Sequence, residues 1–484
     1  MKNAPSEKIR ESYLKFFESQ GHLRLPSYSL VPVNDPTLLI INAGMAPMKS
    51  YFKGEAEPPR RRVTTCQKCV RVGDIEQVGK TARHLTFFEM LGNFSFADYY
   101  KRETIKWAWE YVTDVLKIPA EKLYISVHTD DDEAEEIWNR EVGIPLEKIT
   151  RLEDNFWGPV GKTGPCGFCS ELMVDQGEEF SCGKPDCKPG CDCDRYLEIW
   201  NLVFTGLFKN EDGEFEKLPG QCIDTGLGFE RIVAYLQGKQ SPYDTDLFEN
   251  VMKTVKSICG KTLDQKDFRR EIIITADHTR AATFMASDGI TPSNEGRGYV
   301  MRRLIRRAVR AGQILGFEDH SLTELVIPLI EKFAPVYPEL MEKKDYIISI
   351  LGTEEKNFRR TLNQGVSILE GMLQVLKKEG KKVLSGKDMF TLYDTYGFPR
   401  ELTQEIAREQ GFEVEIESFQ KALEEQRERA RSDTLSKLEN VSGDIDLSRY
   451  DSSFSGYHQL DQETIILEIF KDGQPVNSIF AGDK

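Results

Sequence analysis

One short string of the sequence combines glycine, arginine and acidic residues in an order suited to binding a ligand. It is Asp224-Thr225-Gly226-Leu227-Gly228-Phe229-Glu230-Arg231, which leads from a strand pattern into an apolar helix. Alternate glycines let the backbone approach a ligand closely, and arginine can stack on a planar ring or pair with a phosphate. Taken alone, the string is more typical of a glycine-rich corner between a strand and a helix.

A second string has the composition of a nucleotide-binding hairpin. Cys69-Val70-Arg71 is followed by a polar loop over 73–81 and then by an aromatic and acidic strand over 83–94. Such a hairpin offers a cation to phosphate, a ring to a base and a carboxylate to an amine. The alternative is a core hairpin whose phenylalanines simply pack. Together the two strings favour a nucleotide site.

A cluster of cysteines has the spacing of a metal site. Six of the ten cysteines lie between Cys166 and Cys193, a distribution that favours metal ligation over disulfides. Four of them, separated by glycines and prolines, suit a tetrahedral zinc knuckle, with reduced thiols that bind no metal as the alternative. The predicted zinc ligands are Cys182, Cys187, Cys191 and Cys193. We place Cys166 in a separate Gly-Pro-Cys loop.

A run of arginines between residues 297 and 310 contains no acidic residue. At about 100° per residue, five of these arginines share one helix face and leave Met301, Leu304, Ile305 and Ala308 to face inward. The five are Arg302, Arg303, Arg306, Arg307 and Arg310. A solvated basic face is the alternative, but in a chain of net charge −15 an uncompensated arginine stripe favours phosphate binding.

The whole chain of 484 residues is too long for one core, so two or three domains are expected. Its composition, 39% hydrophobic with 64 basic and 79 acidic residues, disfavours a disordered or fibrous protein. No apolar run is long enough to span a membrane, and no secretory signal is visible at the start. We therefore expect a cytoplasmic protein.

The expected fold is α+β. Strand patterns dominate residues 1–245, which predicts a mixed, largely antiparallel sheet with helices packed against it and a cysteine-rich insertion at 166–193. Residues 246–448 are mainly helical, with only Ile272–Ile274 strand-like, and residues 449–484 resemble the start of a β-domain. Expected strands lie at 38–41, 63–72, 84–97, 123–128, 196–208, 221–225, 464–470 and 475–480, and expected helices at 103–116, 246–260, 297–315, 322–334, 345–378, 387–393 and 401–440.

The glycine-rich string at 224–231 and the hairpin that follows Cys69 resemble the class II aminoacyl-tRNA synthetases, and within them the alanyl-tRNA synthetase family. The hairpin that begins at Arg71 looks like that family's motif 2, Gly226 to Arg231 like its motif 3, and residues 29–45 like its motif 1. Asp224 replaces the generic first glycine of motif 3, as in the alanyl branch. Further strings of the same type are Asp154 to Trp157, Gly164 to Gly167, Glu198 to Phe204, Pro292 to Asn294, Gly298 to Val300 and Leu392 to Pro399. The resemblance covers residues 10 to about 450 and implies the class II antiparallel sheet.

The resemblance implies a two-step reaction. ATP and L-alanine form alanyl-adenylate and pyrophosphate, with Mg²⁺ on the phosphates, and a terminal hydroxyl of tRNA(Ala) then takes the alanyl group. Arg71 and Arg231 would be the catalytic residues, the first on the α-phosphate and the second on the adenine. The ATP site would comprise Arg71, His84, Phe88, Gly228 and Arg231. The alanine site would comprise Trp157, Asn201, Val203 and Asp224, with Asp224 on the substrate ammonium.

The family also binds tRNA through its helical region. By resemblance, Asn294 and Asp394 lie on either side of a G·U pair in the acceptor stem, and Arg306 contacts a phosphate. His278, in a string at an expected helix start, would serve capping geometry. Since the β-domain only begins near residue 449, we expect a monomeric chain that lacks the editing domain and does not proofread.

Two other functions stay open from the residues. One is an enzyme that activates alanine but loads a carrier protein or a small molecule instead of tRNA; the arginine stripe with Asn294 and Asp394 argues against it. The other is a non-catalytic RNA-binding module built on the cysteine cluster and the basic helix. The combined nucleotide and amino-acid residues argue against that module.

Overall fold

The computed structural model describes residues 1–185, 187–191, 193–318, 321–426, 428, 465–471 and 474–480. Its contacts divide the chain into two units, Met1–Arg360 and Thr361–Lys484. The expected boundary at residue 245 lies inside the first unit, and the division into three domains stays a prediction. Within the described ranges, no helix is long and apolar enough to span a membrane.

The first unit is built on a mixed, mostly antiparallel sheet. Its described strands run in the order β1-β2-β3-β9-β8-β7-β4-β5, and β6 also pairs with β7. Among the described strands of this sheet, only the β1–β2 and β4–β5 pairs are parallel. The strands are β1 (Leu23–Arg24), β2 (Arg62–Val70), β3 (Phe87–Phe96), β4 (Leu123–His128), β5 (Ile149–Leu152), β6 (Phe156–Trp157), β7 (Gly164–Asp175), β8 (Tyr196–Lys209) and β9 (Phe215–Gly228). This confirms the expected α+β sheet.

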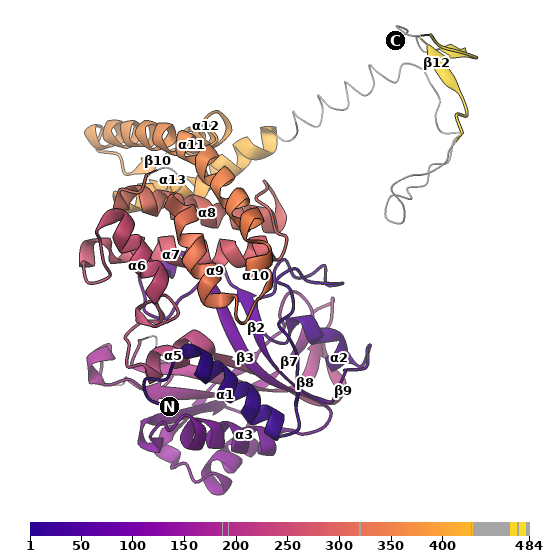
Figure 1. Cartoon of the computed structure of the whole chain (residues 1–484), viewed down its shortest axis with the longest axis vertical. Coiled ribbons are helices and arrows are strands. Elements are labelled where there is room, and N and C mark those ends of the chain that lie inside the picture. Colours follow the sequence, from indigo (N-terminus) through magenta and orange to yellow (C-terminus); the bar gives the residue numbers. More distant parts are fainter. Residues whose placement is uncertain are drawn as a thin grey trace. The chain divides into compact units, whose positions relative to one another are not determined.

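Helices cover one face of this sheet, where α1 and α3 lie close together in Figure 1. The aromatic side chains of α1 pack on β8: the rings of Tyr13 and Phe17 lie 5.5 and 6.2 Å from the ring of Trp200. Because side chains alternate along a strand, Asn201 and Val203 point to the opposite face. The helices of this part are α1 (Ser6–Ser19), α2 (Lys49–Lys53), α3 (Lys101–Glu110), α4 (Asp132–Glu136) and α5 (Phe229–Leu236), with π-helical turns at Tyr111–Val115 and Ile137–Glu141.

The chain after α5 is mainly helical, as predicted. In the first unit α8 packs on α7 and α9 (Figure 1). The helices are α6 (Glu249–Cys259), α7 (Lys266–Ser287), α8 (Gly296–Leu315), α9 (Ser321–Phe333), α10 (Glu339–Glu342) and α11 (Lys344–Lys378), the last continuing into the second unit. The second unit adds α12 (Gly386–Asp394), α13 (Arg400–Glu409) and the short strands β10 (Val383–Leu384), β11 (Glu413–Val414), β12 (Ile469–Lys471) and β13 (Gln474–Val476).

Two strand predictions were wrong. Residues 38–41 form a loop whose Ile40 and Ile41 side chains are buried. Strand β1 pairs with β2 only at Val63 and Thr64, and near the end of β2 the Val70 N–H donates to the Ile41 carbonyl at 2.9 Å. The apolar run thus touches β2 at one point without forming a strand ladder with it. Residues 272–274 lie inside α7, whose residues from Ile272 to Ser287 are all buried. A helix buried on every side has no apolar periodicity to distinguish it from a strand.

The single helix predicted over 401–440 was also wrong. Helix α13 ends before Gly411, which has a φ of 81°, and a new helix begins at residue 416. A positive φ is typical of the glycine that ends a helix. Past residue 426 most of the expected helix lies outside the described residues. The hairpin predicted near the end is confirmed in part, because β12 pairs antiparallel with β13; its turn at 472–473 lies outside the described residues.

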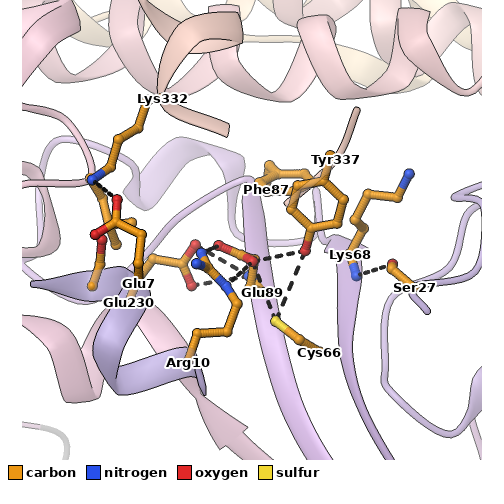
Figure 2. A network of polar contacts seen from close by, with 12 residues as sticks. Glu7, Arg10, Ser27, Cys66, Lys68, Phe87, Glu89, Glu230, Lys332 and Tyr337 are labelled. Atoms are coloured by element: carbon orange, nitrogen blue, oxygen red, sulfur yellow. Dashed lines mark hydrogen bonds and ion pairs between the residues drawn. The ribbon is translucent and has the colours of Figure 1, made fainter. Parts of the chain in front are cut away.

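A buried network of polar side chains joins the helices to the centre of the sheet (Figure 2). Glu89 of β3 receives a bidentate ion pair from Arg10 of α1, at 2.9 and 2.6 Å, and a hydrogen bond from the Tyr337 hydroxyl at 2.8 Å. Its backbone N–H donates to Glu230 of α5, which pairs with Arg280 of α7 at 2.5 Å. Removing one partner from such a network would leave a buried charge uncompensated, so these contacts fix α1, α5 and α7 against β3.

Candidate active site

A cavity of about 190 Å³, partly open to solvent, lies over β3, β8 and β9. All five residues predicted to bind ATP lie in its wall, although they come from three separate stretches of sequence. The lining residues are Arg71, Asp74, Arg83, His84, Leu85, Phe88, Met90, Glu198, Ile199, Gly226, Gly228, Glu230 and Arg231.

Arg71 and Phe88 face each other across the start of the hairpin. Arg71 follows directly after β2, and its backbone N–H donates to the Thr86 carbonyl at 2.9 Å. Its Nε donates to the carbonyl of Asn42 at 2.9 Å, and its guanidinium carbon lies 5.1 Å from the centre of the Phe88 ring. Arg71 is therefore held in place by backbone on one side and by an aromatic ring on the other.

Arg231, in the first turn of α5, is fixed by the neighbouring strand. Its Nη1 donates to the backbone carbonyl and to the carboxylate of Glu198 on β8, both at 3.0 Å. The glycines of β9 leave room beside it: a Cβ on Gly226 would lie 2.9 Å from the sulfur of Met90, and a Cβ on Gly228 3.3 Å from Arg231 Cδ. Strand β9 therefore presents backbone without side chains between Met90 and Arg231. A planar ring could lie against this backbone, with these two side chains on either side.

His84 lines the cavity and lies in the loop that joins β2 and β3. Its Nδ1 lies 2.5 Å from the hydroxyl of Thr81. Burial, and then the guanidinium of Arg83, lower the pKa of His84 below its ordinary value. The imidazole is therefore neutral at pH 7, where it can make hydrogen bonds but adds no positive charge.

Asp224 lies on β9 directly opposite Val203 of β8 and is 5% exposed. Burial raises the pKa of its carboxyl to about 7, although the Arg71 guanidinium opposes the rise. A buried carboxylate without full compensation suits a cationic ligand, which would supply the missing charge. This environment fits the predicted contact with a substrate ammonium.

Asn201 presents an unsatisfied acceptor close to Asp224. It pairs in register with Gly226 of β9, and among the described residues no donor meets its buried Oδ1. Its Nδ2 lies 3.5 Å from a carboxylate oxygen of Glu171. Burial and then the Glu198 carboxylate raise the pKa of Glu171 to about 7. A buried acceptor of this kind is a point where a ligand donor can bind.

Trp157 and Val203, the other two residues of the predicted alanine site, lie on strands of the same sheet. Trp157 lies on β6, opposite Gly167 of β7, and is half-buried against the apolar cluster that contains Phe94 and Val160. Val203 is buried on β8. Sequence and fold thus put all four predicted alanine-site residues on β6, β8 and β9 of one sheet.

The four predicted zinc ligands come together between β7 and β8. Their sulfur atoms all lie within 4.8 Å of one another, with Cys182 3.5 Å from Cys191 and Cys187 3.6 Å from Cys193. Tetrahedral zinc–thiolate bonds place sulfurs about 3.8 Å apart, so the set is compatible with zinc. Cys166 is not in a loop as predicted: it is buried within β7.

The arginine stripe differs from the prediction in two ways. Arg307 points inward at 4% exposure, and its Nε donates to Nε2 of His278 at 3.1 Å. Arg302 and Arg306 are not uncompensated, because both pair with Glu354, at 3.4 and 2.9 Å. Helix α8 buries a wide arc because it packs on both α7 and α9. The stripe that remains is narrower and partly neutralised.

The predicted tRNA residues each have a partner within their own unit. Asn294 precedes α8, and its side-chain carbonyl accepts from Arg302. Asp394 ends α12, and its carboxylate accepts from Gln426. His278 lies in the middle of α7 and not at a helix start, so its capping role was wrong.

Sequence reasoning missed Glu198 and Met90 as part of the cavity. Glu198 opens one of the strings that resemble the alanyl family, and Met90 lies two residues from Phe88. Strand alternation could have placed Met90 beside Phe88, since residues two apart share a face. Nothing in the sequence signals that Glu198 holds Arg231, because that contact depends on the register of β8 with β9.

Comparison with known proteins identifies the family. A family model described as tRNA synthetases class II (A) matches residues 8–484. The chain belongs to this family. The sequence resemblance to class II synthetases is therefore confirmed, together with the α+β fold.

Curated relatives of this class II chain extend well beyond it. It is 51% identical over 491 residues to an alanine–tRNA ligase of Thermoanaerobacter sp. (strain X514), covering 100% of this chain and 55% of that protein. It is 52% identical over 489 residues to the alanine–tRNA ligase of Carboxydothermus hydrogenoformans, covering 99% of this chain and 56% of that protein. The chain thus spans about half the length of these relatives. An apo S. aureus histidyl-tRNA synthetase structure aligns at 12% identity and a TM-score of 0.30, over 51% of this chain and 71% of that one.

Proposed function

We propose that this class II chain is an alanine–tRNA ligase, which activates L-alanine with ATP and transfers it to the 3′ end of tRNA(Ala). The observation that carries the proposal is the juxtaposition of two sites. One cavity is lined by every residue expected to bind ATP. The buried carboxylate of Asp224 lies on β9, the same strand as the cavity residues Gly226 and Gly228. Identity of about 50% to curated alanine–tRNA ligases supports the same activity.

The activation step needs no nucleophilic side chain. The alanine carboxylate would attack the α-phosphorus of ATP, the bond to the β-phosphate oxygen would break, and pyrophosphate would leave. In our proposal Phe88 and Arg231 stack on the adenine, and Arg71 neutralises charge on the α-phosphate. Mg²⁺ would arrive on the phosphates of ATP, and the cavity wall includes the carboxylates of Asp74 and Glu198. Alignment and fixed positive charge are sufficient for this chemistry.

Selectivity for alanine would come from Asp224, Asn201, Val203 and Trp157. Asp224 would pair with the ammonium group, and the unsatisfied Oδ1 of Asn201 would accept a further hydrogen bond. Val203 and Trp157 would leave space for a methyl group. One methyl is worth only ~1–3 kcal/mol, so the site would discriminate poorly against glycine and serine.

Binding of tRNA(Ala) is the second part of the proposal. Asn294 and Asp394 would each read one side of an acceptor-stem G·U pair, because short amide and carboxylate groups suit the shallow minor groove of A-form RNA. Each would exchange its present protein partner, Arg302 or Gln426, for the RNA. Arg306, already paired with Glu354, would contact a phosphate.

The cysteine cluster would hold a structural zinc ion. Four thiolates complete a tetrahedral shell and leave no open position for catalysis, so the ion would stabilise the connection between β7 and β8. In our proposal the zinc knuckle would affect the reaction only indirectly, by holding the backbone to which Arg83 is bonded. Arg83, which lines the cavity, donates to the Cys193 carbonyl at 3.3 Å and to Asp194 at 2.8 Å.

Binding of a stable mimic of alanyl-adenylate tests the activation site. We expect calorimetric titration with alanyl-sulfamoyl adenosine to give a Kd at least about 100-fold below that of ATP or alanine, because the mimic occupies both sites at once. Asp224→Asn should lose most of this gain. Affinity no greater than that of adenosine would contradict the proposal.

A charging assay tests the tRNA part. With alanine, ATP and Mg²⁺, the chain should charge tRNA(Ala), and replacement of the acceptor-stem G·U pair by G·C should slow charging by about tenfold or more, the cost of a lost base contact. Equal rates with both tRNAs would refute the assigned roles of Asn294 and Asp394. Binding of RNA without any ATP turnover would favour a non-catalytic module.

A further inference from the structure

Arg307 links the basic helix α8 to the loop that binds ATP in our proposal. We call residues 71–86, between β2 and β3, the 71–86 loop. The guanidinium of Arg307 donates from Nε to His278 of α7 at 3.1 Å and from Nη2 to the Ile75 carbonyl of the loop at 3.4 Å. All three residues are buried. Arg307 is thus an inward-facing contact between two helices and the loop, distinct from the outward-facing Arg302 and Arg306.

The contact with Arg307 fixes the hydrogen of the His278 ring. A guanidinium only donates, so Nε2 of His278 must accept and Nδ1 must carry the hydrogen. Nδ1 lies 2.8 Å from Oδ2 of Asp277 and 3.2 Å from the hydroxyl of Thr86. The ring is therefore the neutral Nδ1–H tautomer, and it carries a continuous chain of hydrogen bonds from α8 to the Asp277 carboxylate.

The Asp277 carboxylate then reaches the far end of the loop. It accepts from the backbone N–H of Thr86 at 3.0 Å and lies 2.9 Å from the Tyr243 hydroxyl. That hydroxyl is also 2.9 Å from the His84 carbonyl. The Thr86 carbonyl accepts from the N–H of Arg71. The chain of contacts thus ends on the backbone at or beside Arg71 and His84, two residues that line the cavity.

We infer that Arg307, acting through His278 and Asp277, is a positioning residue that holds the 71–86 loop in the shape that binds ATP. The inference rests on the proposed function for its consequence in ATP binding, but the hydrogen-bond chain stands on the geometry alone. Arg307 makes no contact with the reacting atoms in this scheme; it sets where Arg71 and His84 lie. Since Arg306 is the adjacent residue on α8, RNA bound there would act on the same helix that supports the loop.

The test compares Arg307→Met, Arg307→Lys and a matched control, Arg269→Lys. Arg269 is a half-buried arginine of α7 that pairs with Asp244, and neither residue lines the cavity. In ATP–pyrophosphate exchange with alanine, Arg307→Met should raise the KM for ATP about tenfold or more, the usual effect of a lost buried charged hydrogen bond, while kcat changes less than about threefold. Arg307→Lys keeps a donor and should recover most of the loss, and Arg269→Lys should leave the KM unchanged.

Hydrogen–deuterium exchange supplies a readout that does not depend on activity. In Arg307→Met, backbone amides of the 71–86 loop should exchange at least about tenfold faster, while those of β4 keep their protection. Unchanged loop exchange, or equal loss of protection in the loop and in β4, would overturn the inference. If the unsubstituted protein showed no pyrophosphate exchange, the proposed function would fail, while the amide comparison would still decide whether Arg307 holds the loop.

Discussion

Replacing Asp224 by Asn should stabilise the fold while destroying alanine activation. The side chain is buried, and burial raises the pKa of the Asp224 carboxyl from the ordinary 3.8 to about 7. A carboxyl whose folded-state pKa lies above its unfolded value binds protons more tightly when folded. It therefore lowers stability as pH rises from about 4 to 7, and this cost stays constant above pH 7. Asparagine has nearly the same shape and carries no charge at any pH.

The magnitude follows from the two pKa values. The pKa of Asp224 differs by about 3 between the unfolded state, at 3.8, and the folded state, at about 7. At pH 8 this difference lowers the free energy of unfolding of the ligand-free protein by roughly 4 kcal/mol. By pH 4 the cost falls below about 1 kcal/mol, because the carboxyl is then largely protonated when folded and about half protonated when unfolded. The same titration should raise kcat/KM for alanine about tenfold between pH 6 and pH 8, since only the carboxylate binds an ammonium group.

Urea unfolding of the two proteins at pH 8 and pH 4 measures this directly. Asp224→Asn should be more stable by a few kcal/mol at pH 8 and nearly equal at pH 4. Asp246→Asn is the matched control with the opposite sign. Burial acts to raise the pKa of Asp246, but hydrogen bonds from Ser6 and Gln237 outweigh it, so this carboxylate is favourable and its loss should destabilise the fold at pH 8. Equal stability of Asp224→Asn and the unsubstituted protein at pH 8, or a gain that persists at pH 4, would refute the reasoning.

Three further predictions concern other parts of the chain. Arg231→Ala should lower ATP–pyrophosphate exchange at least about 100-fold by removing the fixed cation held by Glu198, and near-normal exchange would remove the assigned ATP site. Asp394→Ala should leave exchange unchanged and slow charging of tRNA(Ala) about tenfold; equal loss in both assays would argue against a tRNA role. Elemental analysis should find one zinc per chain, with little in Cys191→Ser, and chelation should lower the Tm; a metal-free chain of unchanged Tm would contradict the zinc knuckle.

Local sequence pattern was enough to predict which of these residues lie close together. The glycines of β9 and the arginine that opens α5 follow from one string, and Phe88 follows from the strand pattern of the hairpin. The cysteine spacing also predicted which four sulfurs meet. In each case the residues are close in sequence, or their strands adjoin, so short-range rules suffice.

Long-range packing explains what the sequence did not reveal. At ~100° per residue Arg307 lies about 60° from Leu304, at the edge of the buried arc, and its inward direction depends on α7 and α9 both packing on α8. The pairing of Arg231 with Glu198 depends on the register between β8 and β9. The apolar run at 38–41 resembles a strand, but it meets β2 through the hydrogen bond from the Val70 N–H to the Ile41 carbonyl and not through a strand ladder, which local pattern does not reveal.

The most direct test of the central claim is ATP–pyrophosphate exchange with each of the twenty amino acids in the absence of tRNA. If the cavity and Asp224 form an alanine-activating site, exchange should be strongest with alanine, weaker with serine and glycine, and at background with larger side chains. Strong exchange with a large amino acid, or none with any amino acid in a protein that is folded and binds tRNA, would contradict the account.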